Sequence, residues 1–152
     1  MRIICLDIGS KRIGVAASDP LGWTAQGVEV IERKGNKKDM ERICEICREW
    51  EAEKIVAGLP LNEEGEIGPA AKKIQGFVDK LKVHLEGAKL DIDVEMWDER
   101  YSTAIAEERL IEADVSRKKR KRVIDKMAAT VILQDYLEAN EISTDVDESA
   151  EG

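Results

Sequence analysis

The fold is decided in the stretch from residue 2 to residue 18, which reads RIICLDIGSKRIGVAAS. Residues 2–8 are mostly apolar and predict a strand, and the polar turn after them begins at Gly9. Residues 13–18 return as a second apolar strand. Because a turn this short joins antiparallel strands, the chain opens on a β-hairpin.

The hairpin continues into a larger sheet along the chain. Asp19-Pro20-Leu21-Gly22 is a turn signal, and residues 25–32 predict a third strand. Beyond it, hydrophobic periodicity predicts helices over 37–51, 69–86, 103–113 and 123–139, and strands over 54–58 and 90–97. Three meander strands followed by alternating helices and strands predict an α/β fold. In that fold one five-stranded mixed sheet is flanked by helices.

Length and charge divide the chain into a body and a tail. The 152 residues suit one domain with a single core. The net charge of −8 is uneven, because residues 138–152 carry six acidic and no basic residues. The remainder holds 26 acidic and 24 basic residues, so its near neutrality does not exclude a nucleic-acid partner. We expect one domain over residues 1–139 and an acidic, disordered tail over 140–152.

The apolar segments indicate a cytoplasmic protein that does not bind membranes. None reaches the roughly 18 to 20 residues of a membrane helix, and the first meets Asp7 too early for a signal peptide. Three cysteines fit a reducing compartment. Cys44 and Cys47 form a C-x-x-C, but helical periodicity places both on one apolar face with Trp50. We interpret them as core residues, not as a redox pair or zinc ligands.

Acidic residues at three distant positions are candidates for one site. Asp7 ends the first strand, Asp98 and Glu99 end the fifth, and Asp125 comes early in the last helix. Each has a local alternative, as a turn residue or as an acid at a helix N-terminus. The predicted topology can nevertheless bring them to one sheet edge, where carboxylate oxygens would suit Mg²⁺. Carboxylates gathered without histidine, cysteine or a nucleophilic serine favour metal-assisted phosphodiester hydrolysis.

Basic residues lie next to these acids in the sequence. Lys11 and Arg12 follow Asp7 and could bind phosphate or remain solvated turn charges. A run of six basic residues precedes Asp125 and consists of Arg117, Lys118, Lys119, Arg120, Lys121 and Arg122. Such a run predicts contacts with nucleic-acid phosphates, the alternative being a solvated loop. Because aromatic residues are few, we expect recognition of backbone and shape.

Two further polar residues could contact a substrate. Asn62 follows Gly58-Leu59-Pro60-Leu61 and could bind the substrate or hold its own loop. Arg100 could bind phosphate or pair with Glu99.

Four strings carry a family resemblance. They are Asp7-Ile8-Gly9-Ser10-Lys11-Arg12-Ile13-Gly14-Val15-Ala16, Gly58-Leu59-Pro60-Leu61-Asn62, Asp98-Glu99-Arg100-Tyr101-Ser102-Thr103 and Asp125-Lys126-Met127-Ala128-Ala129. In this order they resemble the YqgF family, whose members are described as Holliday junction resolvases or pre-16S rRNA nucleases. The resemblance runs from residue 2 to about residue 138 and implies an RNase H-like fold.

The resemblance implies a nuclease of the two-metal type. Mg²⁺ or Mn²⁺ would be held by Asp7, Glu99 and Asp125, with Asp98 as the rival of Glu99 because the strand register is open. The implied role is processing of the 5′ end of pre-16S rRNA in ribosome biogenesis, and the alternative is Holliday junction resolution in DNA recombination and repair. The partner would be structured RNA or branched DNA, bound mainly through backbone phosphates by a monomer or homodimer.

Two rival interpretations do not require nuclease activity. The first is a non-catalytic nucleic-acid-binding or ribosome-assembly factor, for which an acidic cluster beside phosphates would bring no advantage. The second is an ATP-binding domain of the actin and sugar-kinase type, which also opens with a strand, an Asp-x-Gly turn and a second strand. That type needs two related domains, whereas this sequence supplies one.

Overall fold

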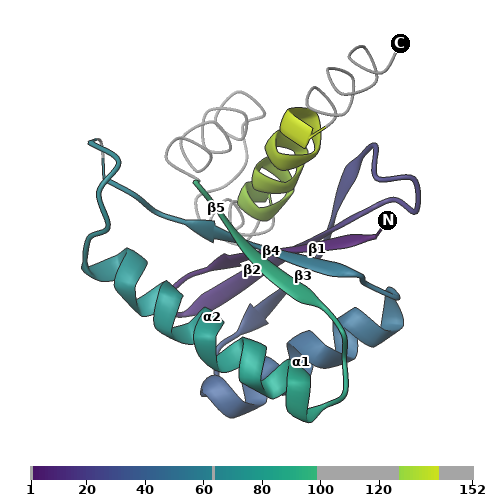
Figure 1. The fold of residues 1–152 in the computed structure, drawn as a ribbon, viewed down its shortest axis with the longest axis horizontal. Coiled ribbons are helices and arrows are strands. Elements are labelled where there is room, and N and C mark those ends of the chain that lie inside the picture. The colour runs from purple at the N-terminus through teal and green to yellow at the C-terminus, as the bar shows by residue number, and fades with distance from the viewer. Residues whose placement is uncertain (1, 63, 99–126, 141–152) are drawn as a thin grey trace, which may run out of the picture.

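The computed structural model describes residues 2–62, 64–98 and 127–140 (Figure 1). The elements are β1 (Ile3–Ile8), β2 (Arg12–Ser18), β3 (Ala25–Glu32), α1 (Asn36–Glu49), β4 (Lys54–Leu59), α2 (Pro69–Gly87) and β5 (Asp93–Asp98). A further helix, here called the C-terminal helix, is described over residues 127–140. The predicted helix over 103–113, the basic run and residues 141–152 of the tail lie outside the described residues.

The strands form one five-stranded mixed sheet in the order β3-β2-β1-β4-β5, which confirms the prediction. β2 is antiparallel to both β1 and β3, whereas β4 is parallel to both β1 and β5. The carboxyl ends of β1, β4 and β5 therefore meet at one edge of the sheet, here called the carboxyl edge.

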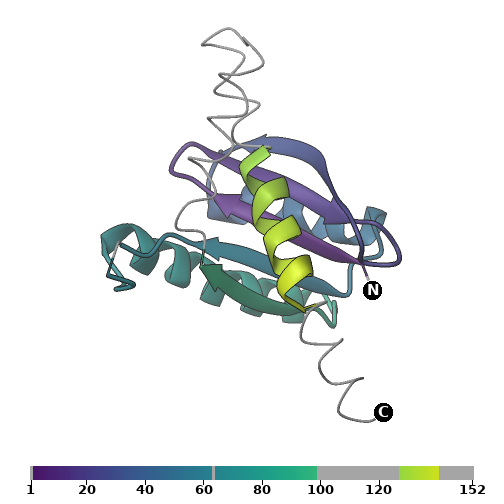
Figure 2. The ribbon, with the colours of Figure 1, turned by 90° about the horizontal axis from the view of Figure 1, so that it is seen from above.

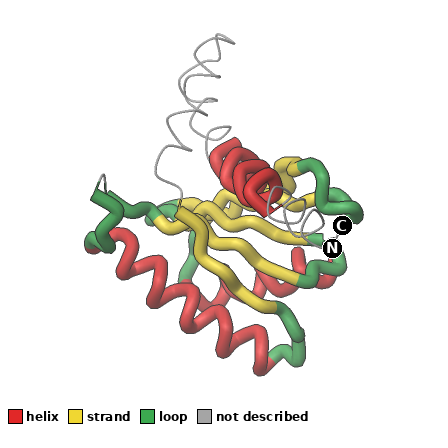
Figure 3. The backbone as a smooth tube through the Cα atoms, turned by 45° about the horizontal axis from the view of Figure 1, so that its top comes forward, coloured by secondary structure: helices red, strands yellow, loops and turns green. Residues whose placement is uncertain are grey.

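Helices cover the two faces of the sheet unequally. α1 and α2 lie on one face, and the C-terminal helix runs obliquely across the other (Figures 1, 2 and 3). Side chains of β1 alternate between the two layers. Ile4 and Leu6 belong to the larger core under α1 and α2, while Ile3 and Cys5 belong to a smaller core under the C-terminal helix.

The fifth strand is shorter at its start than the sequence pattern predicts. It begins at Asp93, not at residue 90, because α2 is followed by a tight closing turn. Lys89 has a φ of 60°, and the Leu90 amide donates to the Leu85 carbonyl at 3.0 Å. Leu90 and Ile92 still pack against the larger core, so their alternating burial resembled a strand pattern.

The C-x-x-C of α1 is part of the core, as interpreted. Cys44 and Cys47 are both buried in the cluster under α1 and α2. Burial raises the pKa of the Cys47 thiol to about 12 and also raises the pKa of Cys44. Because the thiolate is the reactive form, these two residues are not suited to redox or metal chemistry.

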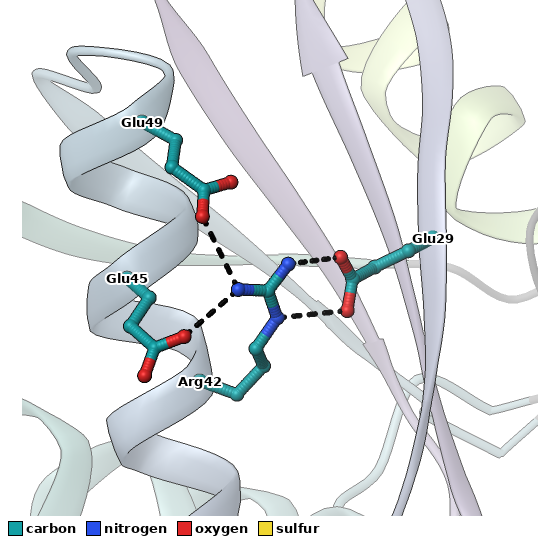
Figure 4. A network of polar contacts seen from close by, with 4 residues as sticks. All are labelled: Glu29, Arg42, Glu45 and Glu49. Carbon is teal, nitrogen blue, oxygen red and sulfur yellow. Dashed lines mark hydrogen bonds and ion pairs between the residues drawn. The ribbon is translucent and has the colours of Figure 1, made fainter.

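Arg42 ties α1 to the sheet. Its guanidinium donates to both carboxylate oxygens of Glu29 on β3, at 2.5 and 3.0 Å (Figure 4). It also reaches Glu45 at 2.9 Å and Glu49 at 3.3 Å, one turn apart on its own helix. A fork of donors suits such a bidentate pair, and the arginine also separates three carboxylates that would otherwise repel.

A three-residue network docks the C-terminal helix on β4 and β5. The Lys54 ammonium donates to the Tyr136 hydroxyl at 2.7 Å, and that hydroxyl donates to Glu95 at 2.6 Å. Lys54 and Glu95 also pair directly at 2.8 Å. The Trp97 ring meets Tyr136 edge to face, with centroids 5.2 Å apart, and its indole donates to Asp135 at 3.0 Å. The helix thus has a fixed position on the sheet.

Replacing Tyr136 by phenylalanine should weaken this docking by about 1 to 2 kcal/mol, because both hydroxyl hydrogen bonds are lost from a buried position. Urea unfolding of both proteins at neutral pH measures the difference. An unchanged unfolding midpoint would show that the network does not hold the helix.

The docking network also predicts how the difference in unfolding free energy between the unaltered protein and Tyr136→Phe varies with pH. Hydrogen bonds from Lys54, and then from Tyr136, lower the pKa of Glu95 below its ordinary 4.5. The ionised Glu95 carboxylate therefore stabilises the folded protein fully above pH 4.5. This stabilisation is lost as the pH falls through the lower pKa that Glu95 has in the folded state. The Lys54 pKa is raised mainly by Glu95, so its contribution persists until alkaline pH. The difference between the two proteins should shrink in acid.

Candidate active site and nucleic-acid interface

Asp7 lies at the carboxyl edge with glycines beside it. It is half-buried on β1 and pairs in register with the buried Gly14 of β2. On the other side, Leu6 pairs with Ala57 of β4, and the next residue of β4 is Gly58. Strand alternation puts Asp7 on the face of the C-terminal helix, with Ile3 and Cys5. Both neighbouring positions are therefore glycines, which place no side chain beside Asp7.

The register of β5 places Asp98 on the other face of the sheet. Trp97 packs under the C-terminal helix, and Asp98 is the exposed residue that follows it. Because neighbours on a strand point to opposite faces, Asp98 projects on the α1 and α2 side, away from the face of Asp7. The structure therefore does not bring Asp98 and Asp7 together. Glu99 lies outside the described residues.

The C-terminal helix packs across the face of the sheet on which Asp7 lies. Its Tyr136 contacts Lys54, the first residue of β4, and also Glu95 and Trp97 of β5. Its apolar side chains cover Ile3 and Cys5 of β1. Ala128 and Ala129 are fully buried, as expected from their small size, and allow close packing on the sheet. Asp125 lies outside the described residues.

The β1–β2 turn is held by its backbone. The Gly9 amide donates to the Arg12 carbonyl at 2.8 Å, and a Cβ on Gly9 would lie only 2.8 Å from that same oxygen. Glycine is required here by close approach. The Arg12 side chain pairs with Glu32 at 3.1 Å, whereas the Lys11 side chain is exposed and its carbonyl accepts the Arg33 amide. Lys11 is thus the more accessible of the two predicted phosphate-binding residues.

Asn62 holds its own loop. Its side-chain oxygen accepts the Glu66 amide at 2.7 Å, and its backbone amide donates to the Glu66 carbonyl at 3.1 Å. This geometry matches the loop-holding alternative for Asn62. The other predicted contacts, Arg100 and residues 117–122, lie outside the described residues.

Comparison with known proteins identifies the family. The family model RuvX, described as Holliday junction resolvase, matches residues 1–139. The chain belongs to the RuvX (YqgF) family. This confirms the resemblance drawn from the four strings, and the match covers the whole sheet and the described helices.

Relatives of this RuvX-family chain extend over nearly its full length. A protein of Desulforamulus reducens is 54% identical over 139 residues, covering 91% of this chain and 98% of its own. A protein of Syntrophomonas wolfei is 52% identical, covering 95% of this chain and 99% of its own. Both carry the description "Putative pre-16S rRNA nuclease".

Solved structures confirm the RNase H-like fold. The structure of T. thermophilus RuvC in complex with a Holliday junction substrate aligns with a TM-score of 0.54 at 14% identity. The alignment covers 93% of this chain and 96% of RuvC. At that identity the likeness concerns the fold.

The described part of the RuvX-family chain holds only a portion of the predicted metal site. Within it, no group of three histidine, cysteine, aspartate or glutamate side chains is arranged to hold a metal ion, and Glu99 and Asp125 lie outside it. Asp7 offers the hard oxygen donor that Mg²⁺ prefers, and the neighbouring positions on β2 and β4 are glycines. No helix in residues 2–62, 64–98 and 127–140 is long and apolar enough to cross a membrane.

Sequence reasoning missed a cavity at the carboxyl edge. It has a volume of about 820 Å³ and opens on the α1 and α2 side, lined in part by Arg33, Lys73 and Lys80. The sequence does hold one signal of a basic surface here. Lys73 and Lys80 are seven residues apart, a spacing that puts two side chains on the same side of a helix. The convergence of three separate segments on α2 could be seen only in the folded chain.

Proposed function

We propose that this chain is a metal-dependent endonuclease that hydrolyses phosphodiester bonds during processing of the 5′ end of pre-16S rRNA. The observation that carries the proposal is the position of Asp7. It lies half-buried at the carboxyl edge, between Gly14 and Gly58, on the face that the C-terminal helix covers. The description shared by relatives at 54% and 52% identity supports the choice of RNA.

Mg²⁺ or Mn²⁺ would be held by Asp7, Glu99 and Asp125. The register of β5 supports Glu99 over Asp98, because Asp98 falls on the opposite face from Asp7. Asp125 lies two residues before the described part of the C-terminal helix, which packs on the same face of the sheet as Asp7. Two such ions, when bound, supply an activated water and stabilise the leaving oxygen of a phosphodiester.

The nucleic acid would be bound mainly through its phosphates. Lys11 is exposed on the turn that follows Asp7, and Arg100 follows Glu99 directly in the sequence. The basic run over 117–122 ends three residues before Asp125, so it would border the same site. These contacts fit a structured RNA recognised by backbone and shape, cleaved in the cytoplasm by a monomer.

Holliday junction resolution is the second candidate function. The RuvX family model carries that description, and the fold matches a resolvase solved with its junction. A resolvase cuts two strands related by a two-fold axis, so this function would require a symmetric homodimer. Oligomeric state therefore separates the two candidates independently of cleavage.

Offering the purified protein three substrates side by side tests the proposal. With Mn²⁺ present, we expect cleavage of a pre-16S rRNA leader and much slower cleavage of a four-way DNA junction or a DNA duplex. Gel filtration of the same sample should give a monomer. Symmetric cleavage of the junction by a dimer would instead establish the resolvase function. Absence of cleavage of all three with Mg²⁺ and with Mn²⁺ would contradict both.

A further inference from the structure

The cavity at the carboxyl edge occupies a position where α/β proteins bind ligands. It lies beyond the ends of β1 and β4, with Gly9 and Ser10 on one side and Pro60 on the other. β1 and β4 are neighbours in the sheet, but the chain leaves them in opposite directions. After β1 it continues to β2 on one side, and after β4 it continues through α2 to β5 on the other. Such a switch in connection opens a crevice at the carboxyl ends of the strands.

The charged groups of the cavity wall are cationic. Lys73 and Lys80 lie seven residues, or about two helical turns, apart on α2, so both lie on the side of the helix that lines the cavity. Both are exposed, and within the described part of the chain neither makes an ion pair. No aspartate or glutamate is found among the described residues that line the cavity. An anion entering it would meet two uncompensated positive charges.

Arg33 gives this wall a fixed shape. Its guanidinium donates to buried Asp39 at 3.0 Å, to the Gly9 carbonyl at 3.0 Å and to Asn36 at 2.9 Å. It also lies over the Phe77 ring, 5.1 Å from the centroid. These contacts join the β1–β2 turn to both helices. The cavity is therefore built by the fold before any ligand arrives.

The rest of the wall is largely apolar, with Ser10 and Asn36 as its neutral polar residues. Pro60, Pro69 and Ile74 provide hydrophobic surface, and Gly76 provides space because nothing lies within 4 Å of the point where its Cβ would be. A volume of about 820 Å³ lies within the range of small-molecule sites. A ligand that combines an apolar body with a negative charge would complement both parts of this wall.

We propose that this cavity binds one nucleotide unit, with its phosphate on Lys73 and Lys80 and its base or sugar against Pro60, Pro69 and Ile74. The unit could be a free nucleoside monophosphate or the phosphorylated end of a strand, which share this chemistry. The cavity lies on the α1 and α2 side, whereas Asp7 lies on the other face of the sheet. Nucleotide binding here therefore does not depend on the proposed metal chemistry.

Calorimetric titration with adenosine 5′-monophosphate in metal-free buffer tests the assignment. We expect saturable binding with a Kd of about 1 mM or tighter. The double variant Lys73→Gln with Lys80→Gln should weaken it at least about tenfold, because charge-assisted contacts to phosphate are lost. The matched control is Lys72→Gln with Lys82→Gln, which removes the same charge from exposed positions of α2 outside this cavity.

A second variant tests the cavity without altering charge. Gly76→Leu places a side chain in the open space, so it should also weaken binding at least about tenfold while the helix is retained. Asp7→Asn should bind the nucleotide as the unaltered protein does. Displacement of the monophosphate by a 5′-phosphorylated oligonucleotide would assign the site to a strand end, and failure to displace it would assign the site to a free nucleotide. No saturable binding, or equal binding by the unaltered protein, the double variant and Gly76→Leu, would overturn the proposal.

Discussion

Replacing Asp7 by asparagine should lower the rate of phosphodiester cleavage at least about a hundredfold and leave the fold intact. The two side chains have nearly the same size, so the packing at the end of β1 should be retained. What changes is the charge, since a neutral amide is a weaker ligand for Mg²⁺ or Mn²⁺ than a carboxylate. Single-turnover cleavage with saturating enzyme, across a range of Mn²⁺ concentrations, measures the loss of rate and any loss of metal affinity.

Two neighbouring acids provide the matched comparison. Asp98→Asn removes one charge from an exposed residue on the opposite face of the sheet from Asp7, so it should change the rate by no more than a few-fold. Glu99→Gln should behave like Asp7→Asn. The opposite result, with loss in Asp98→Asn and activity in Glu99→Gln, would assign the second ligand to Asp98.

Retention of the full rate by Asp7→Asn would end the nuclease proposal. The non-catalytic interpretation would then account for the chain, provided that binding of RNA persists. A contaminating nuclease would also give the same rate in the unaltered protein and in Asp7→Asn. The comparison therefore uses protein whose cleavage activity co-elutes with it from two chromatography columns of different types.

The sheet could be predicted from sequence because its strands carry their own signals. The stretch from residue 2 to residue 18 contains two apolar runs and a short turn, which dictate an antiparallel pair. Each later strand is likewise bounded by turn residues or a helix. The fifth strand was predicted three residues too early because Leu90 and Ile92 are partly buried without being part of the ladder. Alternating burial cannot by itself separate a strand from a turn packed on the core.

The face of the sheet on which each acidic residue of β5 lies could not be predicted from the sequence, because it depends on contacts between residues distant in sequence. Whether Asp98 or Glu99 shares a face with Asp7 depends on which side of β5 carries Trp97. That side is fixed by Tyr136 in the C-terminal helix, 5.2 Å away between ring centroids. The cavity beside α2 has the same origin, since Arg33 reaches it from the β3–α1 connection and Gly9 from the β1–β2 turn.

Changing all six basic residues of 117–122 to glutamine should weaken nucleic-acid binding strongly at low salt. Each phosphate contact releases counterions, so the logarithm of the affinity falls with the logarithm of salt concentration at about 0.9 per contact for duplex and 0.7 for single strands. If all six side chains contact phosphate, the slope should become shallower by about 4 to 5. Fluorescence anisotropy with a labelled RNA leader, titrated at several potassium chloride concentrations, measures both affinity and slope.

A control with equal charge change separates local contact from net charge. Six exposed basic residues elsewhere can be changed to glutamine, namely Lys34, Lys37, Lys38, Arg48, Lys72 and Lys82. Both variants lower the net charge equally, so both lose the same long-range attraction. Only the variant of 117–122 should lose the steep slope, because only contacts at the phosphates release counterions. Equal slopes in the two variants would show that the run is a solvated loop and that the RNA contacts another surface of the domain.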